Sequence, residues 1–225
     1  MNISFEASDI EKDSADELAA VFKNCDAVIG CSGTEGSSDI QLKLTQAAIA
    51  TGIKRYIPWQ FGVDYDILER ESIQDLFDEQ LDVCAALREQ NDIGWVIVST
   101  GSFMSLLFED FFGVVSRDRK TARALGIWQN TVTVTDVEDV GKVTAEVGWD
   151  GDGIRNEVVF IAGDTISYED LTEAAEEVQS SPIERIEWTV QYLKEELVRD
   201  PENSIKKYRV VFAEAKMSLV HYRRR

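Results

Sequence analysis

The chain has 225 residues, of which 44% are hydrophobic, and it carries a formal net charge of −19. This length suits one large α/β domain, or one domain with a small cap. The acidic charge argues against a nucleic-acid groove, where a basic stripe is expected. Because the sequence has neither a signal peptide nor an apolar run of about 18 residues, we expect a cytoplasmic protein with no membrane contact.

The cysteines and the histidine also exclude some kinds of site. Cys25, Cys31 and Cys84 are an odd number and lack CxxC spacing. They therefore indicate reduced thiols rather than a disulfide framework or a zinc site. The one histidine argues against a serine–histidine hydrolase and against histidine-rich metal sites. We expect no metal.

Apolar periodicity predicts alternating strands and helices in the first part of the chain. The predicted elements are a strand over Asn2–Ala7, a helix over Ser14–Lys23, a strand over Cys25–Cys31, a helix over Ser38–Thr51 that stops at Gly52, and a strand over Lys54–Pro58. This β-α-β-α-β order indicates parallel strands joined by crossover helices.

The alternation continues through the rest of the chain. Helices are predicted over Ile73–Gln90, Val137–Trp149 and Tyr168–Val178, and strands over Trp95–Ser99, Thr131–Thr135 and Glu157–Ala162. The segment Met104–Phe112 is rich in aromatic residues, and Ser167 is placed to cap the helix that follows it. From Pro182 onward the pattern predicts a strand, a helix and a last segment, Ile205–Met217.

A glycine-spaced loop follows the apolar run that begins at Ala27. Gly30, Gly33 and Gly36 fit GxxGxxG spacing between a predicted strand and a predicted helix. This arrangement can present backbone N–H groups and a helix N-terminus to phosphate. However, a strand and a helix precede it, and no acidic residue follows at the ribose-binding distance. We therefore interpret it as a later loop of a nucleotide-binding fold.

Five segments in order carry a family resemblance. They are KRYIPWQFGVDYD (Lys54–Asp66), DLFDEQLDV (Asp75–Val83), WVIVSTGSFMSLLFE (Trp95–Glu109), the region Val132–Val147 and NEVVFIAGDTISYEDL (Asn156–Leu171). With them the chain resembles the NmrA-like and isoflavone-reductase-like family of atypical short-chain dehydrogenases, and within it fungal aromatic-alcohol-reductase-like members.

The resemblance implies an α/β, Rossmann-like parallel sheet with helices on both faces. Residues 1–150 would form the NAD(P)-binding-type domain, without the family's usual first βαβ unit. Residues 151–225 would form a smaller C-terminal α+β substrate region interleaved with it. Relative to the family, the chain is expected to be shortened at both ends.

The resemblance also implies a set of ligand-binding positions for NADPH and an aromatic or phenolic substrate. The expected cofactor-binding residues are Asp9, Ile10, Cys31, Ser32, Gly33, Trp59, Gln60, Phe61 and Gly62. The expected substrate-binding residues are Trp59, Thr100, Gly101, Phe103 and Phe108. Without the family's first glycine loop, the phosphates of NADPH lose their main amide contacts. We therefore expect weak cofactor binding.

The expected catalytic residues depart from the family pattern. Gln80 stands where isoflavone-reductase relatives carry a catalytic lysine, and a glutamine cannot act as a general base. It can still orient a hydroxyl through hydrogen bonds. Tyr65 and Ser102 are the other candidates, although the chain has no Tyr-xxx-Lys pair.

Three functions stay open at this point. The first is an NAD(P)H-dependent reductase of secondary metabolism that passes hydride to a small aromatic substrate. The second is a non-catalytic regulatory or protein-binding module of the NmrA type. The third is a cofactor-independent isomerase, lyase or cyclase that uses the same pocket. A homodimer is left open, and no nucleic-acid partner is expected.

Overall fold

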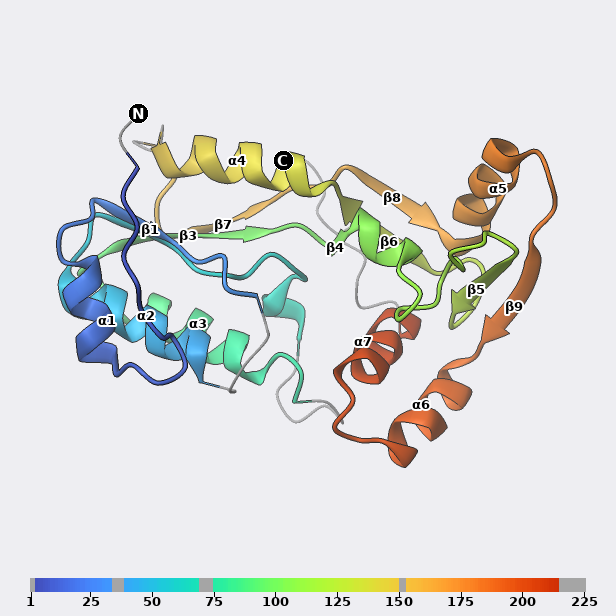
Figure 1. Cartoon of the computed structure of the whole chain (residues 1–225), viewed down its shortest axis with the longest axis horizontal. Helices are drawn as coiled ribbons and strands as arrows, with labels where there is room; N and C mark the ends of the chain where they lie inside the picture. Colours follow the sequence, from blue (N-terminus) through green and yellow to red (C-terminus); the bar gives the residue numbers. More distant parts are fainter. Residues whose placement is uncertain (1–2, 34–38, 69–74, 150–152, 215–225) are drawn as a thin grey trace. The chain divides into compact units, whose positions relative to one another are not determined.

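The computed structural model describes residues 3–33, 39–68, 75–149 and 153–214 (Figure 1). These residues form two compact units that alternate along the chain. Unit 1 comprises the described residues within Met1–Gln60, Tyr65–Val98 and Val143–Val159, and unit 2 those within Phe61–Asp64, Ser99–Lys142 and Phe160–Arg225. The domain boundary expected at residue 150 stays a prediction.

Unit 1 is built on a four-stranded sheet. Its strands are β1 (Ala27–Ile29), β2 (Arg55–Ile57), β3 (Gly94–Ser99) and β7 (Glu157–Phe160), in the order β1-β2-β3-β7. β2 is parallel to both β1 and β3, with Tyr56 opposite Val28 on one side and Trp95 on the other. The predicted α/β class and the parallel pairing of these three strands are confirmed.

Helices cover both faces of this sheet (Figure 1). They are α1 (Ala15–Phe22), α2 (Ile40–Thr51), α3 (Asp78–Glu89) and the part of α4 (Val137–Trp149) that belongs to unit 1, from Val143 onward. Adjacent residues of a strand point to opposite faces. The Tyr56 hydroxyl accepts a hydrogen bond from Thr45 of α2 at 3.3 Å. On the other face, a Cβ at Gly148 of α4 would lie 3.6 Å from Ile57.

Local capping signals set the helix ends where the sequence predicts them. Ser14 and Glu17 form a capping box at the start of α1. Gly52 ends α2 with φ = 64°, a left-handed conformation that glycine adopts without a steric penalty. α3 begins at Asp78, later than predicted, because residues 75–77 are not helical; residues 73–74 lie outside the described part.

The strand predicted over Asn2–Ala7 is wrong for the described residues 3–7. This stretch forms no strand, and Ile3 and Phe5 are 73% and 95% exposed. A strand needs a ladder partner as well as suitable side chains. Within the described residues β1 pairs with β2 alone, and its other side is an open edge of the sheet.

Unit 2 contains two small sheets. In the first, β6 (Thr131–Thr135) lies between the parallel strand β4 (Ser102–Phe103) and the antiparallel strand β8 (Asp164–Ser167). In the second, β5 (Thr121–Leu125) is parallel to β9 (Glu184–Trp188). Its helices are α5 (Tyr168–Gln179), α6 (Val190–Arg199), α7 (Ser204–Ala213) and the 3-10 turn η2 (Met104–Phe108); another 3-10 turn, η1 (Tyr65–Ile67), belongs to unit 1.

The core of unit 2 joins elements that are distant in the chain. The rings of Phe112 and Phe212 are both buried and lie edge to face, with centroids 5.0 Å apart. Asn130 donates from its side-chain amide to the carbonyls of Leu125 and Ala213. α7 is therefore held against the β5 region by both apolar and polar contacts.

Candidate functional site

The loop after β1 is held by a buried glutamine at the start of α2. Nε2 of Gln41 donates to Oγ of Ser32 at 2.8 Å and to the carbonyl of Gly33 at 2.7 Å. Gln41 is 2% exposed, and its Oε1 has no hydrogen-bond partner in the described part of the chain. Two predicted cofactor residues are thus joined to a side chain that the sequence analysis missed.

The glycine spacing of this loop serves packing at Gly30. A Cβ there would lie 2.8 Å from the backbone nitrogen of Trp59, closer than real Cβ atoms come. Glycine is therefore required for the close approach of the loop to the chain after β2. Cys31, another predicted cofactor residue, is exposed beside it, whereas Gly36 lies outside the described residues.

The N-terminus of α2 is already capped by a carboxylate of α3. Oε1 of Glu79 accepts from the backbone N–H groups of Gln41 at 2.6 Å and Leu42 at 3.2 Å. α2 has no side-chain cap of its own and no acidic residue in its first turn. Burial raises the pKa of Glu79, and the two N–H bonds oppose that shift. These two amides are therefore not presented to a phosphate.

Two more buried side-chain amides, those of Gln60 and Gln80, lie close to the point where the chain leaves β2. Gln60 is fully buried, and its Nε2 donates to the backbone carbonyl of Gln80 at 3.0 Å and contacts Sγ of Cys84 at 3.8 Å. Gln80 is 3% exposed. The Oε1 atoms of both glutamines have no partner among the described residues. The structure thus brings together Gln60, a predicted cofactor residue, and Gln80, a predicted catalytic one.

We call Gln41, Gln60 and Gln80 the amide site. Gln41 contacts the loop after β1, and Gln60 follows β2, so both lie at the carboxyl ends of parallel strands. Glu79, which binds the backbone of Gln41, is the chain neighbour of Gln80. The first turn of α3 therefore links the three, and this end of the sheet is where open α/β folds bind ligands.

Other predicted residues of unit 1 lie in different surroundings. Tyr65 is buried, and its ring packs edge to face on Phe77 at 5.9 Å. Trp59 is half-buried. The Asp9 carboxylate pairs with Lys12, which lowers the pKa of Asp9, and Ile10 packs against the α1–α2 cluster of Leu18, Ile40, Leu44 and Ala47.

In unit 2 the structure joins Gly62 to Thr100 and Gly101. The Gly62 carbonyl accepts from the N–H groups of Thr100 at 3.0 Å and Gly101 at 2.9 Å. Gly101 has φ = 69°, and a Cβ there would lie 2.4 Å from the carbonyl of Thr133. Thr100 is fully buried, and its carbonyl accepts from Thr135 at 2.6 Å. These polar groups hold the chain after β3, next to half-buried Phe61.

The remaining predicted residues follow in β4 and η2. Ser102 is buried, pairs with Val134 of β6 and donates to the carbonyl of Phe103 at 3.3 Å. Phe108 is 45% exposed and lines a hollow of about 260 Å³. The other lining residues are Val115, Arg119 and the α5 residues Leu171, Ala174, Ala175 and Val178. Tyr65 and Gln80 belong to unit 1 and Ser102 to unit 2.

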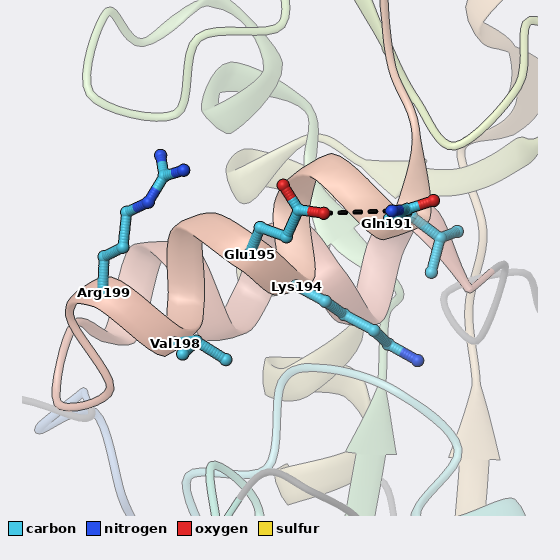
Figure 2. A pocket seen from close by; sticks show the side chains of 6 residues that line it. Gln191, Lys194, Glu195, Val198 and Arg199 are labelled. Carbon is cyan, nitrogen blue, oxygen red and sulfur yellow. Dashed lines mark hydrogen bonds between the residues drawn. The ribbon is translucent and has the colours of Figure 1, made fainter.

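A larger hollow of about 720 Å³ lies along α6 (Figure 2). Figure 2 shows Gln191 and Glu195 joined by a hydrogen bond of 3.0 Å, with Val198 and Arg199 farther along the same helix. All six lining residues come from α6, so the hollow offers a ligand one wall without converging polar groups. None of the predicted site residues lies there.

The described residues contain neither a membrane-spanning helix nor a cluster of metal ligands. No helix in this part of the chain is long and apolar enough to cross a membrane. No group of three or more His, Cys, Asp or Glu side chains in it could hold a metal ion.

Comparison with known sequences gives a family. The model of the NmrA-like family matches residues 4–219. The chain is 43% identical to an NmrA-like family domain-containing oxidoreductase of Gibberella moniliformis, over 96% of this chain and 71% of that protein. It is 27% identical to oxidoreductase aprR of Aspergillus flavus, over 80% of this chain and 59% of that protein.

Solved structures give the fold. The chain matches AtPrR2 with NADP+ and (+)pinoresinol with a TM-score of 0.76 at 18% identity, over 92% of this chain and 70% of that one. It matches isoflavone reductase with a TM-score of 0.75 at 17% identity, over 92% and 67%. The leucoanthocyanidin reductase–NADPH complex of Vitis vinifera matches with a TM-score of 0.75 at 18% identity, over 93% and 70%. The chain belongs to the NmrA-like family and has a Rossmann-like α/β fold.

Proposed function

We propose that the chain belongs to an NAD(P)H-dependent reductase that acts on a small aromatic or phenolic substrate and binds ligand at the amide site. The observation that carries the proposal is that three buried amide oxygens, on Gln41, Gln60 and Gln80, have no partner among the residues that the structure describes. A buried acceptor without a donor is costly, and nearly all such groups in native proteins find a partner. A ligand with N–H or O–H donors would supply the missing bonds.

The chemistry of these residues fits a nicotinamide cofactor. A nicotinamide carboxamide and a ribose both offer donors that amide oxygens accept. Cys31, Ser32, Gly33, Trp59, Gln60, Phe61 and Gly62 are the residues that we propose hold the cofactor, which supplies the hydride when bound. Support comes from the family and from the NADP+ and NADPH present in two of the similar structures.

The residues proposed at the substrate would bind it and orient its hydroxyl group. Gln80 has no titratable group, so its Oε1 would accept from a substrate hydroxyl and orient it without taking its proton. Tyr65 and Ser102 stay the proposed hydroxyl donors. Trp59, Thr100, Gly101, Phe103 and Phe108 stay the proposed substrate contacts, and the aromatic class is supported by the pinoresinol in one similar structure.

Two observations favour a second candidate, a cofactor-independent isomerase, lyase or cyclase that uses the same pocket. Glu79 occupies the N–H groups of Gln41 and Leu42, and the protein carries a net charge of −19. Both features oppose the binding of a cofactor with several phosphate charges. Such an enzyme would bind an aromatic ligand at the amide site without any dinucleotide.

Titration of the purified chain with NADPH, followed by nicotinamide fluorescence, tests the proposal, with NADH as the comparison ligand. Saturable binding of NADPH that weakens in Gln60→Met would support the reductase. Gln191→Met on α6 is the matched control, because it makes the same exchange at an exposed position of unit 2. Absence of binding at millimolar NADPH would reject the reductase, and aromatic binding without NADPH would then support the second candidate.

A further inference from the structure

Two arginines stack on one tryptophan in unit 2. The guanidinium carbon of Arg123, on β5, lies 5.1 Å from the ring centroid of Trp188, which ends β9. That of Arg209, on α7, lies 4.8 Å from the same ring. We call these three residues the arginine cluster. All of them are half-buried, so the two charges are partly removed from water.

The described hydrogen bonds of the arginine cluster run to backbone carbonyls. Arg209 donates from Nε to Phe112 at 2.9 Å and from Nη2 to Phe111 at 2.7 Å, and Arg123 donates from Nη1 to Gly113 at 3.1 Å. Each guanidinium has five N–H donors. Most donors of both side chains are therefore left without a partner in the described part of the chain.

The cluster also lacks a carboxylate of its own. Within residues 3–33, 39–68, 75–149 and 153–214, no Asp or Glu forms an ion pair with Arg123 or Arg209. Glu196 of α6 attracts Arg209 from a greater distance, but its carboxylate pairs with Arg199 and Lys206. Burial, together with repulsion from Arg123, lowers the pKa of Arg209.

A second arginine–tryptophan contact of unit 2 shows the usual arrangement. Arg185 lies 5.7 Å from the ring centroid of Trp128, and it pairs with the carboxylate of Glu176 at 2.9 Å. One cation on one indole is thus neutralised by one anion. The arginine cluster places two cations on one indole, and no carboxylate in the described part of the chain pairs with either of them, although the net charge of the protein is −19.

We propose that Arg123 and Arg209 form a binding site for an oxyanion, the phosphate or carboxylate group of a small molecule. The planar guanidinium matches such groups with paired N–H donors, and partial burial strengthens these bonds. Gly113 lets the chain pack closely against the cluster, because a Cβ there would lie 3.2 Å from both Nη2 of Arg209 and the Trp188 ring. The site goes beyond the proposed function, since none of its residues belongs to the amide site.

Calorimetric titration of the purified full chain with inorganic phosphate and with acetate, at constant ionic strength, tests the site. We expect saturable binding of at least one anion, weakened about tenfold or more in Arg123→Gln, as the loss of charge-assisted hydrogen bonds predicts. Arg185→Gln is the matched control and should bind as the unchanged chain does. Preference for phosphate would identify a phosphorylated ligand, and preference for acetate a carboxylic acid.

A separate control checks that the variants fold. Arg209 also holds two backbone carbonyls, so Arg123→Gln, with one such bond, is the primary variant, and circular dichroism checks that it folds. Arg209→Lys keeps the positive charge but removes the paired N–H donors of the guanidinium, and it should also weaken anion binding. The proposal is overturned if neither anion binds saturably, or if folded Arg123→Gln binds as tightly as the unchanged chain.

Discussion

The amide site of unit 1 and the arginine cluster of unit 2 differ in the kind of hydrogen-bond partner that the described residues fail to supply. The amide site has buried acceptor oxygens on Gln41, Gln60 and Gln80 for which the described residues supply no donor. The arginine cluster has donor groups on Arg123 and Arg209 for which the same part of the chain supplies no paired anion. Since buried polar groups are normally satisfied, each region indicates its ligand by what it lacks. The first requires a donor, such as a hydroxyl or an amide, and the second requires an oxyanion.

Glu79 sharpens this contrast. In unit 1 the place where an anion would bind, the N-terminus of α2, is filled by the protein's own carboxylate. In unit 2 the two guanidinium groups have no such internal partner among the described residues. A phosphate group is therefore not offered the N-terminus of α2, although the glycine spacing of the sequence points to it, whereas the guanidinium groups of unit 2 offer donors to an oxyanion.

The largest expected effect comes from placing a cation in the amide site. Gln80→Lys restores the amine that the resemblance implies, but the side chain at this position is 3% exposed. A buried ammonium without an anionic partner should lower the free energy of unfolding by about 3 kcal/mol near neutral pH. The loss should shrink as the pH rises, because burial lowers the lysine pKa and the neutral amine costs less. Urea denaturation at several pH values measures both effects.

Gln80→Met is the control for that substitution. It has similar volume and no charge, and it removes an amide oxygen that has no described partner. We expect its unfolding free energy to fall by less than half as much as that of Gln80→Lys, with no pH dependence of the difference. Equal losses in the two variants would show that shape, rather than charge, decides what position 80 accepts.

The next effect concerns the arginine cluster. Arg209→Met removes the donors to the carbonyls of Phe111 and Phe112 but keeps an unbranched side chain over Trp188. We expect the free energy of unfolding to fall by about 2 kcal/mol, since hydrogen bonds from a charged donor are lost. The loss should be larger in phosphate buffer, where the bound anion stabilises the unchanged chain alone. Loss of the same size in chloride and phosphate would contradict anion binding there.

A smaller effect is expected from removal of the cap on α2. Glu79→Ala leaves the N–H groups of Gln41 and Leu42 without their acceptor and should cost about 1 kcal/mol. Glu79→Gln keeps a carbonyl acceptor and should cost less. Thermal unfolding compares the two, and Ser14→Ala, which removes a cap on α1, sets the scale.

The pH dependence of this cap has a definite sign. Burial raises the pKa of Glu79 in the folded chain above its ordinary value of 4.5. At pH values between 4.5 and the folded pKa, the folded chain therefore holds more protons than the unfolded chain. The contribution of this shift to stability is complete below 4.5 and is lost as the pH rises through the folded pKa. Glu79→Gln should therefore reduce the fall of stability with pH in that window. An unchanged pH profile would reject the assignment to Glu79.

Sequence pattern predicts those parts of the fold that depend on local signals. The stop of α2 at Gly52 and the cap of α5 by Ser167 follow from single residues and their immediate neighbours. The segment 3–7 fails because its apolar residues need a strand partner that local pattern does not contain. The pattern does not predict β5 for a related reason, since its partner β9 lies about 60 residues farther along the chain.

The sites show the same limit. Gln60 and Gln80 were selected by resemblance, and the structure shows that they touch. Gln41 and Glu79 carried no signal, because their roles depend on contacts with residues distant in sequence, such as Ser32 for Gln41. Arg123 and Arg209 lie on different elements, and their shared tryptophan is known only once β5, β9 and α7 are packed together.

The smallest expected change in stability, and the clearest for function, comes from Gln60→Met. Methionine nearly conserves the volume of glutamine, so the unfolding free energy should change by less than the roughly 1 kcal/mol expected for Glu79→Ala. The substitution removes the hydrogen bond from Nε2 of Gln60 to the backbone carbonyl of Gln80, a residue of α3. It also removes an acceptor, Oε1 of Gln60, that has no partner among the described residues. If that acceptor serves a ligand, binding of NADPH or of an aromatic compound should weaken about tenfold with stability nearly unchanged. A variant that gains stability and keeps its ligand affinity would instead show that the Gln60 oxygen is an internal defect, and the amide site would lose its strongest member.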